Sequence, residues 1–576
     1  MNQKLENILN VSLDATEDEL RKADSLSTGY NWRDNTWEII VKYSGSLESI
    51  RNRYNVYIKE LLNYYAIIVA DKATIELISQ EDVIDYVEKP KSLYYQIERT
   101  KTAACVGSVR ADGNILSGKG VIVGVIDTGI DIFDNAFRNS DGTTRILNIY
   151  DQTTGEKYDK QSIDEYIRLN EDLSGGTFSY DNAPGVDNIM HGTDVSYIAA
   201  GSLGVAYEAD IIAVKMGYSI NNQFPRTTSL MDAIDYIIRK AIEYRKPVAV
   251  NISYGCNYGA HNGNTLLESF IDDISKSYRC VICVGSGNEA DKAIHFGGII
   301  NTGQVQTAYL SVGEYQSAID IQIWKHYWDT IDVMLINPRG EQIGIITEGR
   351  INRYETYNTE IITLLGEPSP YNIYQEIYIN LIPKTDYILS GIWQIVLMAG
   401  SIRAGEYNIW LPSSQALGYA TAFNNPTADG TITIPATARN CIAVGAYNAY
   451  TNSYAAFSGR GFDNSIRNVN AGVKPDITAP GVDISIARQR GNDITYRNVT
   501  GTSYAVPVVT GAAALLMQWG IVMGNDRFMY GEKLKAALID GSKPVGLVGI
   551  TRNDNQPDPR TGWGAVCLKN TLNKIL

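Results

Sequence analysis

Three short segments contain residues that could together activate a hydroxyl group for nucleophilic attack. In chain order they hold Asp127 in VIVGVIDTGID, His191 in MHGTDVSYIAAG and Ser503 in NVTGTSYAVPVVTGAAALL. A serine hydroxyl becomes a strong nucleophile when an imidazole accepts its proton, and a carboxylate can hold that imidazole in the required tautomer. The three residue types therefore predict acyl transfer, provided that the fold brings them into one cleft.

Each of these residues also has an ordinary structural explanation. Asp127 could cap a turn, a histidine at a helix start is usually structural, and Ser503 could be a helix N-cap. However, Asp127 follows an apolar strand, and open parallel sheets place their sites at that edge. His191 opens a helix after a loop rich in Gly and Asp, and an N-cap does not explain the small residues around Ser503. The combination favours a catalytic site.

The patterning of the chain predicts three kinds of structure. Residues 1–96 alternate in the order β-α-β-β-α-β, which is typical of a ferredoxin-like sandwich. From about Lys101, near-continuous apolar strands alternate with helices, which indicates an α/β core around a parallel sheet. The predicted strands of this core are 121–126, 211–216, 248–253 and 280–284, and one predicted helix is 230–244.

The α/β pattern stops near Gly297 and resumes near Ala436. About seven short alternating runs between these points predict an inserted, jelly-roll-like β-sandwich. We expect its tryptophans to be core residues rather than a ligand platform: Trp324, Trp328, Trp393 and Trp410. The predicted domains are 1–96, 97–300 for the first part of the α/β domain, 301–430 for the insertion, and 431–576 for the second part.

Composition excludes several classes of partner. The formal charge is −14 and no long Lys/Arg tract occurs, so nucleic acid and anionic membrane are not expected partners. No apolar run of about 20 residues stands out, so no membrane span is expected. The N-terminus is polar and acidic and lacks the features of a secretory signal, which predicts an intracellular protein.

The cysteines and histidines are sparse. Six cysteines in 576 residues do not imply a disulfide framework. Cys280 and Cys283 have C-x-x-C spacing but lie in the apolar run RCVICVGSG, so we interpret them as core residues. Four histidines provide little material for a zinc site, and no metal or other cofactor is expected.

Six segments resemble those of the subtilisin family. DTGID, HGTDV and GTSYAVP are similar to its three catalytic signatures, in its chain order. NISYG, VGSGNE and VKPDITAPG also match, so the resemblance covers residues 101–300 and 436–576. It implies a subtilisin-like fold in which Ser503 is the nucleophile, His191 the general base and Asp127 its orienting carboxylate.

The resemblance also implies further roles. The Asn288 side chain and the Ser503 backbone N–H would stabilise the oxyanion. Ser253, Tyr254 and Gly255 would pair with the substrate backbone, and together with Gly285 and Gly287 they would line the first specificity pocket.

The chain departs from the family in two places. The family's HGTH is HGTD here, and Asp194 could either raise the basicity of His191 or bind a basic group of the substrate. The segment SLGVAYEADIIAVK leaves no room for the calcium loop of many subtilisins, so no calcium is expected there.

The first 96 residues resemble a subtilisin propeptide that stays bound non-covalently after cleavage. We expect self-cleavage between about Leu93 and Arg99, after Gln96. The propeptide, the inserted sandwich and the missing calcium loop together resemble the Csp germination proteases of clostridial spores. This resemblance implies limited proteolysis of a zymogen of a spore-cortex-lytic enzyme by a spore-associated protein. The alternatives are an inactive pseudoprotease that signals or binds during germination, and a broad-specificity intracellular subtilase.

Overall fold

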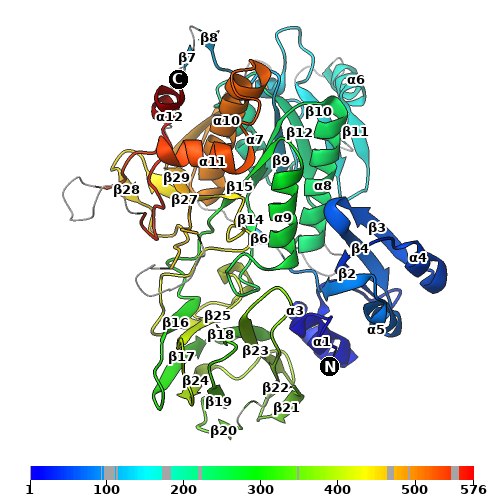
Figure 1. Ribbon diagram of the computed structural model, residues 1–576, viewed down its shortest axis with the longest axis vertical. Helices are drawn as coiled ribbons and strands as arrows, with labels where there is room; N and C mark the ends of the chain where they lie inside the picture. The colour runs from blue at the N-terminus through cyan, green and yellow to red at the C-terminus, as the bar shows by residue number, and fades with distance from the viewer. Residues whose placement is uncertain are drawn as a thin grey trace.

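The structure, a computed structural model, describes residues 2–92, 94–95, 110–111, 114–171, 183–217, 224–344, 346, 349–462, 472–490, 493–546 and 557–576. Three bodies built on sheets are visible in Figure 1: an N-terminal one in blue, a large central one and a two-sheet one in yellow-green.

The N-terminal body is an antiparallel sheet with the strand order β5-β2-β4-β3, and the short β1 also pairs with β2. Helix α4 joins β2 to β3, and helix α5 joins β4 to β5. This is the predicted β-α-β-β-α-β arrangement of a ferredoxin-like fold. The bounds are β1 Tyr30–Asn31, β2 Thr36–Tyr43, α4 Glu48–Tyr54, β3 Tyr57–Leu61, β4 Tyr65–Ala70, α5 Lys72–Gln80 and β5 Ile84–Glu88.

The central body is a nine-stranded sheet in the order β11-β10-β12-β9-β13-β15-β27-β28, with β29 also paired to β27. Its interior strands are parallel, and only β11 and β28 pair antiparallel. The bounds are β9 Ile122–Asp127, β10 Ile146–Asp151, β11 Lys157–Asp159, β12 Asp210–Lys215, β13 Val248–Ile252, β15 Cys280–Gly285, β27 Ile442–Asn448, β28 Ser453–Tyr454 and β29 Ile477–Pro480.

The strand order reverses at β9. The chain adds β10 and β12 on one side of β9, and β13, β15 and β27 on the other. In open α/β sheets, sites form at the carboxyl ends of the strands beside such a reversal. Asp127, the last residue of β9, lies at this point.

Helices cover both faces of the central sheet. One apolar core includes α7 and α10, and a second includes α8 and α9. The sheet strands are buried on both faces, which explains their near-continuous apolar sequences. The bounds are α6 Lys160–Glu171, α7 His191–Ala200, α8 Thr227–Tyr244, α9 Leu266–Ser277, α10 Thr502–Met517, α11 Gly531–Asp540 and α12 Leu568–Ile575.

Two antiparallel sheets form the inserted sandwich, and they enclose a third apolar core. One sheet has the order β16-β25-β18-β23-β22-β21 and the other the order β20-β19-β24-β17-β26. The insertion therefore has more strands than the seven or so runs that the sequence suggested. The bounds are β16 His295–Ile299, β17 Val305–Val312, β18 Ile319–His326, β19 Ile331–Ile336, β20 Gln342–Ile343, β21 Ile351–Glu355, β22 Thr359–Leu365, β23 Tyr374–Pro383, β24 Gly391–Ala399, β25 Glu406–Trp410 and β26 Ala422–Phe423.

The tryptophans of the sandwich divide into two groups. Trp393 and Trp410 are each 1% exposed and Trp324 packs against the core, as predicted. The prediction was wrong for Trp328, which is 41% exposed. Trp328 follows the end of β18, where it stacks on His326 at 4.8 Å between ring centroids instead of entering the core.

The N-terminal body contacts both other bodies. Its sheet packs on α8 and α9, where the rings of Tyr65 and Phe270 lie 5.2 Å apart. Three helices that the sequence did not predict, α1 (Asn7–Asp14), α2 (Glu17–Lys22) and α3 (Asp24–Ser27), share an apolar core with β22 and β23 of the sandwich. Helices this short are stabilised mainly by tertiary packing, so local periodicity signals them poorly.

Helix α10 and its π-helical continuation (Gln518–Val522) are longer and more apolar than the sequence reading allowed. The segment Thr502–Val522 has 21 residues, the length of a membrane span, but 89% of its apolar window is buried inside the fold. It is therefore a core helix. Cys280 and Cys283 are fully buried in β15, as expected, and the five cysteines within the described ranges are free.

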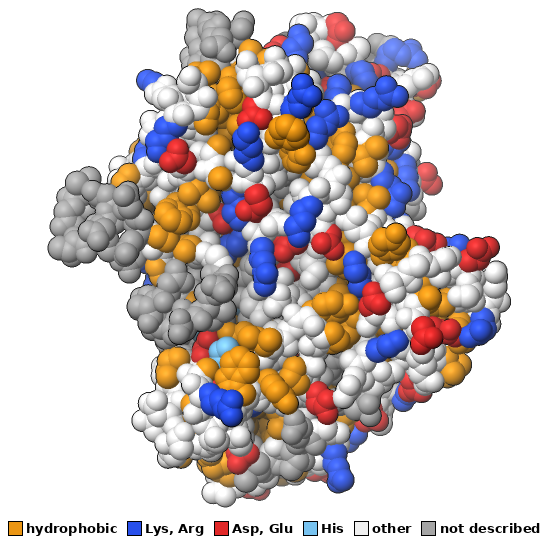
Figure 2. All heavy atoms as spheres, in the orientation of Figure 1, with side chains coloured by type: hydrophobic (Ala, Val, Ile, Leu, Met, Phe, Trp, Pro, Cys, Tyr) orange, Lys and Arg blue, Asp and Glu red, His pale blue; other side chains and the backbone are white. Residues whose placement is uncertain are grey.

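The surface carries mixed charge on the face that Figure 2 shows. Acidic and basic side chains are interspersed there, without one large basic area.

Candidate active site

Asp127 and His191 meet in the interior of the central body. Asp127 ends β9, His191 begins α7, and each is 1% exposed. Nδ1 of His191 lies 2.6 Å from Oδ1 of Asp127, which also accepts a hydrogen bond of 2.8 Å from the Thr128 backbone. The carboxylate therefore orients the ring so that Nε2 is available for chemistry.

A second carboxylate, which the sequence reading missed, organises the start of α7. Oδ1 of Asp187 accepts hydrogen bonds of 2.7 Å from the Thr128 hydroxyl and from the Met190 backbone. Oδ2 accepts bonds of 2.8 Å from both the backbone and the hydroxyl of Thr193. Asp187 thus ties the β9 turn to the histidine helix. The threonines in DTGID and HGTDV could have indicated such a carboxylate, since a buried hydroxyl needs a hydrogen-bond partner.

Ser503 is the second residue of α10, and it is buried. Gly501, two residues before Ser503, has φ 147°, a backbone conformation that residues with a side chain rarely adopt. The glycine therefore allows the sharp turn into the helix. Helix α10 packs against α7, and the ring of Tyr504, the residue after Ser503, lies 5.2 Å from the His191 ring. Among the described residues, His191 Nε2 has no hydrogen-bond partner, so the site is not in its tightened form.

Asn288 presents an amide donor beside the start of α10. Its Oδ1 accepts hydrogen bonds from the Thr502 backbone N–H at 3.0 Å and the Thr502 hydroxyl at 3.1 Å. Since a backbone N–H can only donate, these bonds set the amide orientation and direct Nδ2 elsewhere. Nδ2 is buried and has no acceptor in the part of the chain that the structure describes. Such a donor can stabilise a developing oxyanion.

Tyr254 and Gly255 form a strand edge that pairs with an extended segment of the chain itself. As the short strand β14 (Tyr254–Gly255) they pair antiparallel with β6 (Tyr94–Tyr95) of the N-terminal region. The chain thus adds a strand of its own to this edge, as a bound substrate would. The predicted cleavage residue, Gln96, lies outside the described residues.

Ser253 connects this edge to helix α10. Its hydroxyl donates to the Ser503 carbonyl at 3.3 Å and accepts from Asn251 Nδ2 at 3.0 Å. Oδ1 of Asn251 in turn accepts from the Thr510 hydroxyl at 3.2 Å. Ser253 therefore positions α10 in this structure.

Gly285 and Gly287 lie at the carboxyl end of β15. Gly285 is the last residue of the strand, and Gly287 follows with φ 95°. A Cβ atom on Gly287 would lie 2.6 Å from Cγ2 of Thr433, so a side chain has no room there. Both glycines thus lie on the strand end that leads into Asn288.

The surroundings of His191 favour its charged form. Burial alone lowers the pKa of the imidazole, but the charge and hydrogen bond of Asp127 raise it, and Asp194 and Asp187 add to this effect. The net result is a pKa above the usual value for histidine. A basic His191 is suited to accept a proton from a hydroxyl.

Asp194 contacts two arginines. Its Oδ1 accepts from Arg488 Nε at 3.0 Å and forms an ion pair with the same guanidinium, and its Oδ2 lies 3.3 Å from Nη1 of Arg497. The sequence reading left two roles open, and these contacts give the carboxylate protein partners. No group of three or more His, Cys, Asp or Glu residues that could hold a metal occurs within the described residues.

Comparison with known families identifies the family to which the chain belongs. A model of the subtilase family matches residues 118–371 and 404–564, so the chain belongs to the subtilase family, the subtilisin-like serine proteases. A second model, the Csp protease B prodomain, matches residues 3–91.

A solved structure agrees with both matches. The CspB protease of Clostridium perfringens superimposes with a TM-score of 0.72 and 34% sequence identity, over 80% of this chain and 94% of that one. The predicted subtilisin-like fold with a propeptide of the Csp type is thereby confirmed.

Curated relatives match over shorter stretches. The subtilase-type proteinase RRT12 of Saccharomyces cerevisiae is 33% identical over 22% of this chain, and subtilisin-like protease 10 of Arthroderma otae is 34% identical over 21%. The chain spans only 23% and 27% of the length of these two relatives.

Proposed function

We propose that this chain is a serine endopeptidase that cleaves its own propeptide and then a protein substrate. Ser503 Oγ attacks the scissile carbonyl while His191 accepts its proton, and His191 later donates that proton to the leaving amine. Asp127 holds the imidazole, and Asn288 Nδ2 with the Ser503 backbone N–H stabilises the oxyanion.

One observation carries this proposal: the 2.6 Å contact between His191 and Asp127, buried beside the helix of Ser503. Burying an ionised carboxylate costs several kcal/mol unless its partners compensate. A buried structural histidine usually has both ring nitrogens paired, as His261 has through Ile432 O and Asn257 O. Here Nε2 stays without a partner in the described chain, as a general base requires.

The pairing of β6 with β14 supports self-processing. Tyr95 lies opposite Tyr254 and Tyr94 opposite Gly255, so the described end of the propeptide occupies this edge as an added strand. Cleavage after Gln96 would leave the new carboxyl end in the cleft as a bound product. Non-covalent retention of the propeptide would then restrict access, which suits limited proteolysis.

Intact masses of the wild type and of Ser503→Ala, purified side by side, test the activity. We expect the wild type to split near residue 96 and the variant to stay at the full mass of 63.5 kDa. Ser275→Ala, a buried helical serine whose hydroxyl bonds Ile271 O at 2.8 Å, is the matched control and should process normally. A full-length wild type would favour the pseudoprotease, and equal cleavage in Ser503→Ala would assign the cut to another protease.

We further propose a role in spore germination, supported by the match to the Csp protease B prodomain and by the likeness to the CspB protease. The substrate would be the zymogen of a spore-cortex-lytic enzyme, in or on the spore. The test compares cleavage of a folded cortex-lytic zymogen with that of unfolded casein. A single cut in the zymogen with slow casein digestion is expected; rapid casein digestion without that preference would instead indicate a broad-specificity subtilase.

A further inference from the structure

The carboxylate of Asp194 is buried one helical turn after the general base. It stands three residues beyond His191 on α7, and its side chain has no exposed surface. A carboxylate in such a place is strongly unfavourable unless cations compensate it. The structure supplies two of them, both from outside α7.

Both cations come from the hairpin that precedes the nucleophile. Strand β30 (Ile484–Arg490) pairs with β31 (Asp493–Val499), and Ile486 lies opposite Arg497. Arg488 is two residues from Ile486, so Arg488 and Arg497 project from the same face of the hairpin. That face meets α7 at Asp194. The end of β31 is followed within four residues by Ser503.

Arg488 also bonds the backbone at the start of the histidine helix. Its Nη2 donates to Met190 O at 2.9 Å, while its Nε donates to Asp194 at 3.0 Å. Met190 has φ 69°, an uncommon conformation for a residue other than glycine, and it directly precedes His191. The same guanidinium therefore holds the carboxylate and the peptide that sets the position of His191.

We propose that Asp194 is a positioning residue that, through Arg488 and Arg497, fixes the nucleophile hairpin against the helix of the general base. Contacts with the protein, rather than with a basic group of the substrate, occupy its carboxylate. The inference rests on the proposed function, because it assigns Asp194 a role in placing His191 relative to Ser503.

The charge of Asp194 reaches His191 as well. The titratable groups that face the imidazole are Asp127 from β9, Asp187 from the loop before α7, Asp194 from α7 itself and Tyr504 from α10, and the two arginines of the hairpin lie beside Asp194. Removing the charge of Asp194 takes away one influence that raises the pKa of His191 and leaves two arginines uncompensated. The pKa of His191 should therefore fall.

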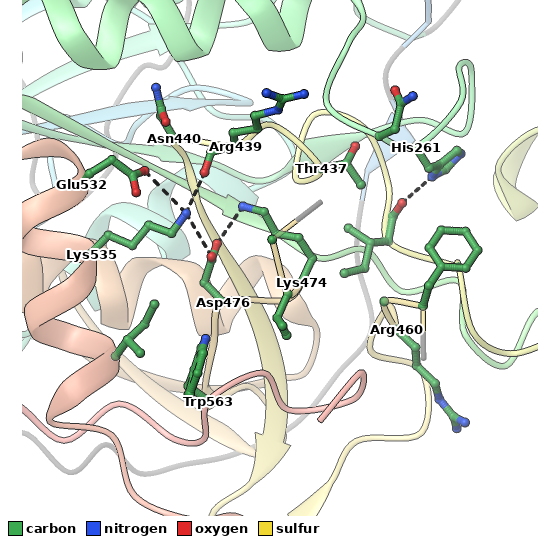
Figure 3. Close-up of a pocket in the computed structure, with 18 residues that line it drawn as sticks. His261, Thr437, Arg439, Asn440, Arg460, Lys474, Asp476, Glu532, Lys535 and Trp563 are labelled. Atoms are coloured by element: carbon green, nitrogen blue, oxygen red, sulfur yellow. Dashed lines mark hydrogen bonds and ion pairs between the residues drawn. The ribbon is translucent and has the colours of Figure 1, made fainter. Parts of the chain in front are cut away.

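A matched control lies elsewhere in the same domain. Asp476, the residue just before β29, is 3% exposed and also pairs with two cations, Lys474 at 2.7 Å and Lys535 at 3.0 Å, as Figure 3 shows. It further accepts from the Ala443 backbone at 2.7 Å. Asp476→Asn disturbs an equivalent buried cluster without touching α7 or the hairpin.

The experiment titrates the full-length chain with 13C-labelled histidine in the Ser503→Ala background, where His191 is one of four histidines. Asp194→Asn should shift the His191 titration to lower pH, and Arg497→Gln, which removes a positive charge at the more exposed end of the cluster, should shift it to higher pH. Asp476→Asn should lower thermal stability and leave the titration unchanged. With Ser503 intact, the acid limb of kcat/KM on labelled casein should move in the same directions.

Two outcomes would overturn the inference. One is an Asp194→Asn variant that is less stable but titrates and reacts like the Asp476→Asn control. The other applies if Asp194→Asn does not fold: an Arg497→Gln variant in which His191 titrates at the same pH as in the parent protein would also contradict the inference. Failure of the proposed function looks different, because the wild type would then have no activity above Ser503→Ala while the His191 titration could still be measured.

Discussion

The active site and the junction between the N-terminal body and the other two bodies both bury charged groups. The two regions differ in whether the buried polar atoms have hydrogen-bond or ion-pair partners. At the junction, Lys91 Nζ lies 2.8 Å from Glu6 and also contacts Glu88, whose second oxygen accepts from the Leu266 backbone at 2.8 Å. In the active site, His191 Nε2 and Asn288 Nδ2 are buried without partners among the described residues.

This difference separates a structural cluster from a functional one. A buried polar atom without a hydrogen bond costs about 1–3 kcal/mol, so most proteins pair nearly all of them. The ion cluster of the junction follows this rule, because Lys91 pairs with both Glu6 and Glu88. In the active site the unpaired atoms of the described residues include Oδ2 of Asp127 and two atoms that the proposed reaction would use, His191 Nε2 as a base and Asn288 Nδ2 as an oxyanion donor.

Asp127→Asn should give the largest effect, because it removes the charge and leaves the size of the side chain unchanged. The imidazole loses its orienting partner, and kcat should fall by about 10⁴. The pKa of His191 should also fall, since Asp127 is the main group that raises it. Steady-state kinetics on labelled casein measures the loss, with the melting temperature as the control for folding. A loss below tenfold in a folded variant would contradict the assigned role.

Lys91→Met tests the junction. The substitution leaves Glu6 and Glu88 facing each other in the interior without a cation, which should cost about 3–5 kcal/mol of unfolding free energy. Lys574→Met removes the exposed pair with Asp540 and should cost less than about 1 kcal/mol. Urea denaturation in the Ser503→Ala background compares the two variants. Equal losses would show that the buried cluster does not hold the bodies together.

Much of this arrangement could be predicted from the sequence. The strand predicted at 280–284 is β15, which runs one residue further to Gly285. The triad segments were recognised from the order of Asp, His and Ser along the chain and from their likeness to the subtilisin signatures. The N-terminal helices and the partners of Asp194 could not be predicted, because they depend on contacts across hundreds of residues. Arg488 and Arg497 lie 294 and 303 positions from Asp194, and nothing local to their strands indicates where they point.

Glu376→Gln tests a buried carboxyl group on β23, on the sandwich side of the junction. Burial, followed by the charge of Glu6, raises the pKa of Glu376 to about 8. Since the folded state holds a proton that the unfolded state releases near pH 4.5, this group favours folding at low pH. That contribution is lost as the pH rises through about 8. The glutamine variant should therefore gain stability relative to the wild type between pH 5 and pH 9, on the order of 4 kcal/mol.

Urea denaturation at both pH values measures this gain. The exposed Glu355, whose pKa Lys384 lowers, is the control, and Glu355→Gln should show no such gain at high pH. A Glu376→Gln variant whose stability relative to the wild type is the same at pH 5 and pH 9 would mean that Glu376 is ionised at the junction throughout.

Thr502→Val should give the smallest effect, and it tests how the amide of Asn288 is held. Valine keeps the backbone N–H that donates to Asn288 Oδ1 at 3.0 Å and removes the hydroxyl that donates at 3.1 Å. Loss of one such bond is worth about 1 kcal/mol, or about fivefold in kcat, with KM little changed. Asn288→Ala, which removes the donor itself, should lower kcat by about 10²–10³. If Thr502 acts only by orienting Asn288, the double variant will be no slower than Asn288→Ala alone. An additional fivefold loss in the double variant would show that the hydroxyl acts on the nucleophile helix directly, because the amide it is thought to orient would already be absent.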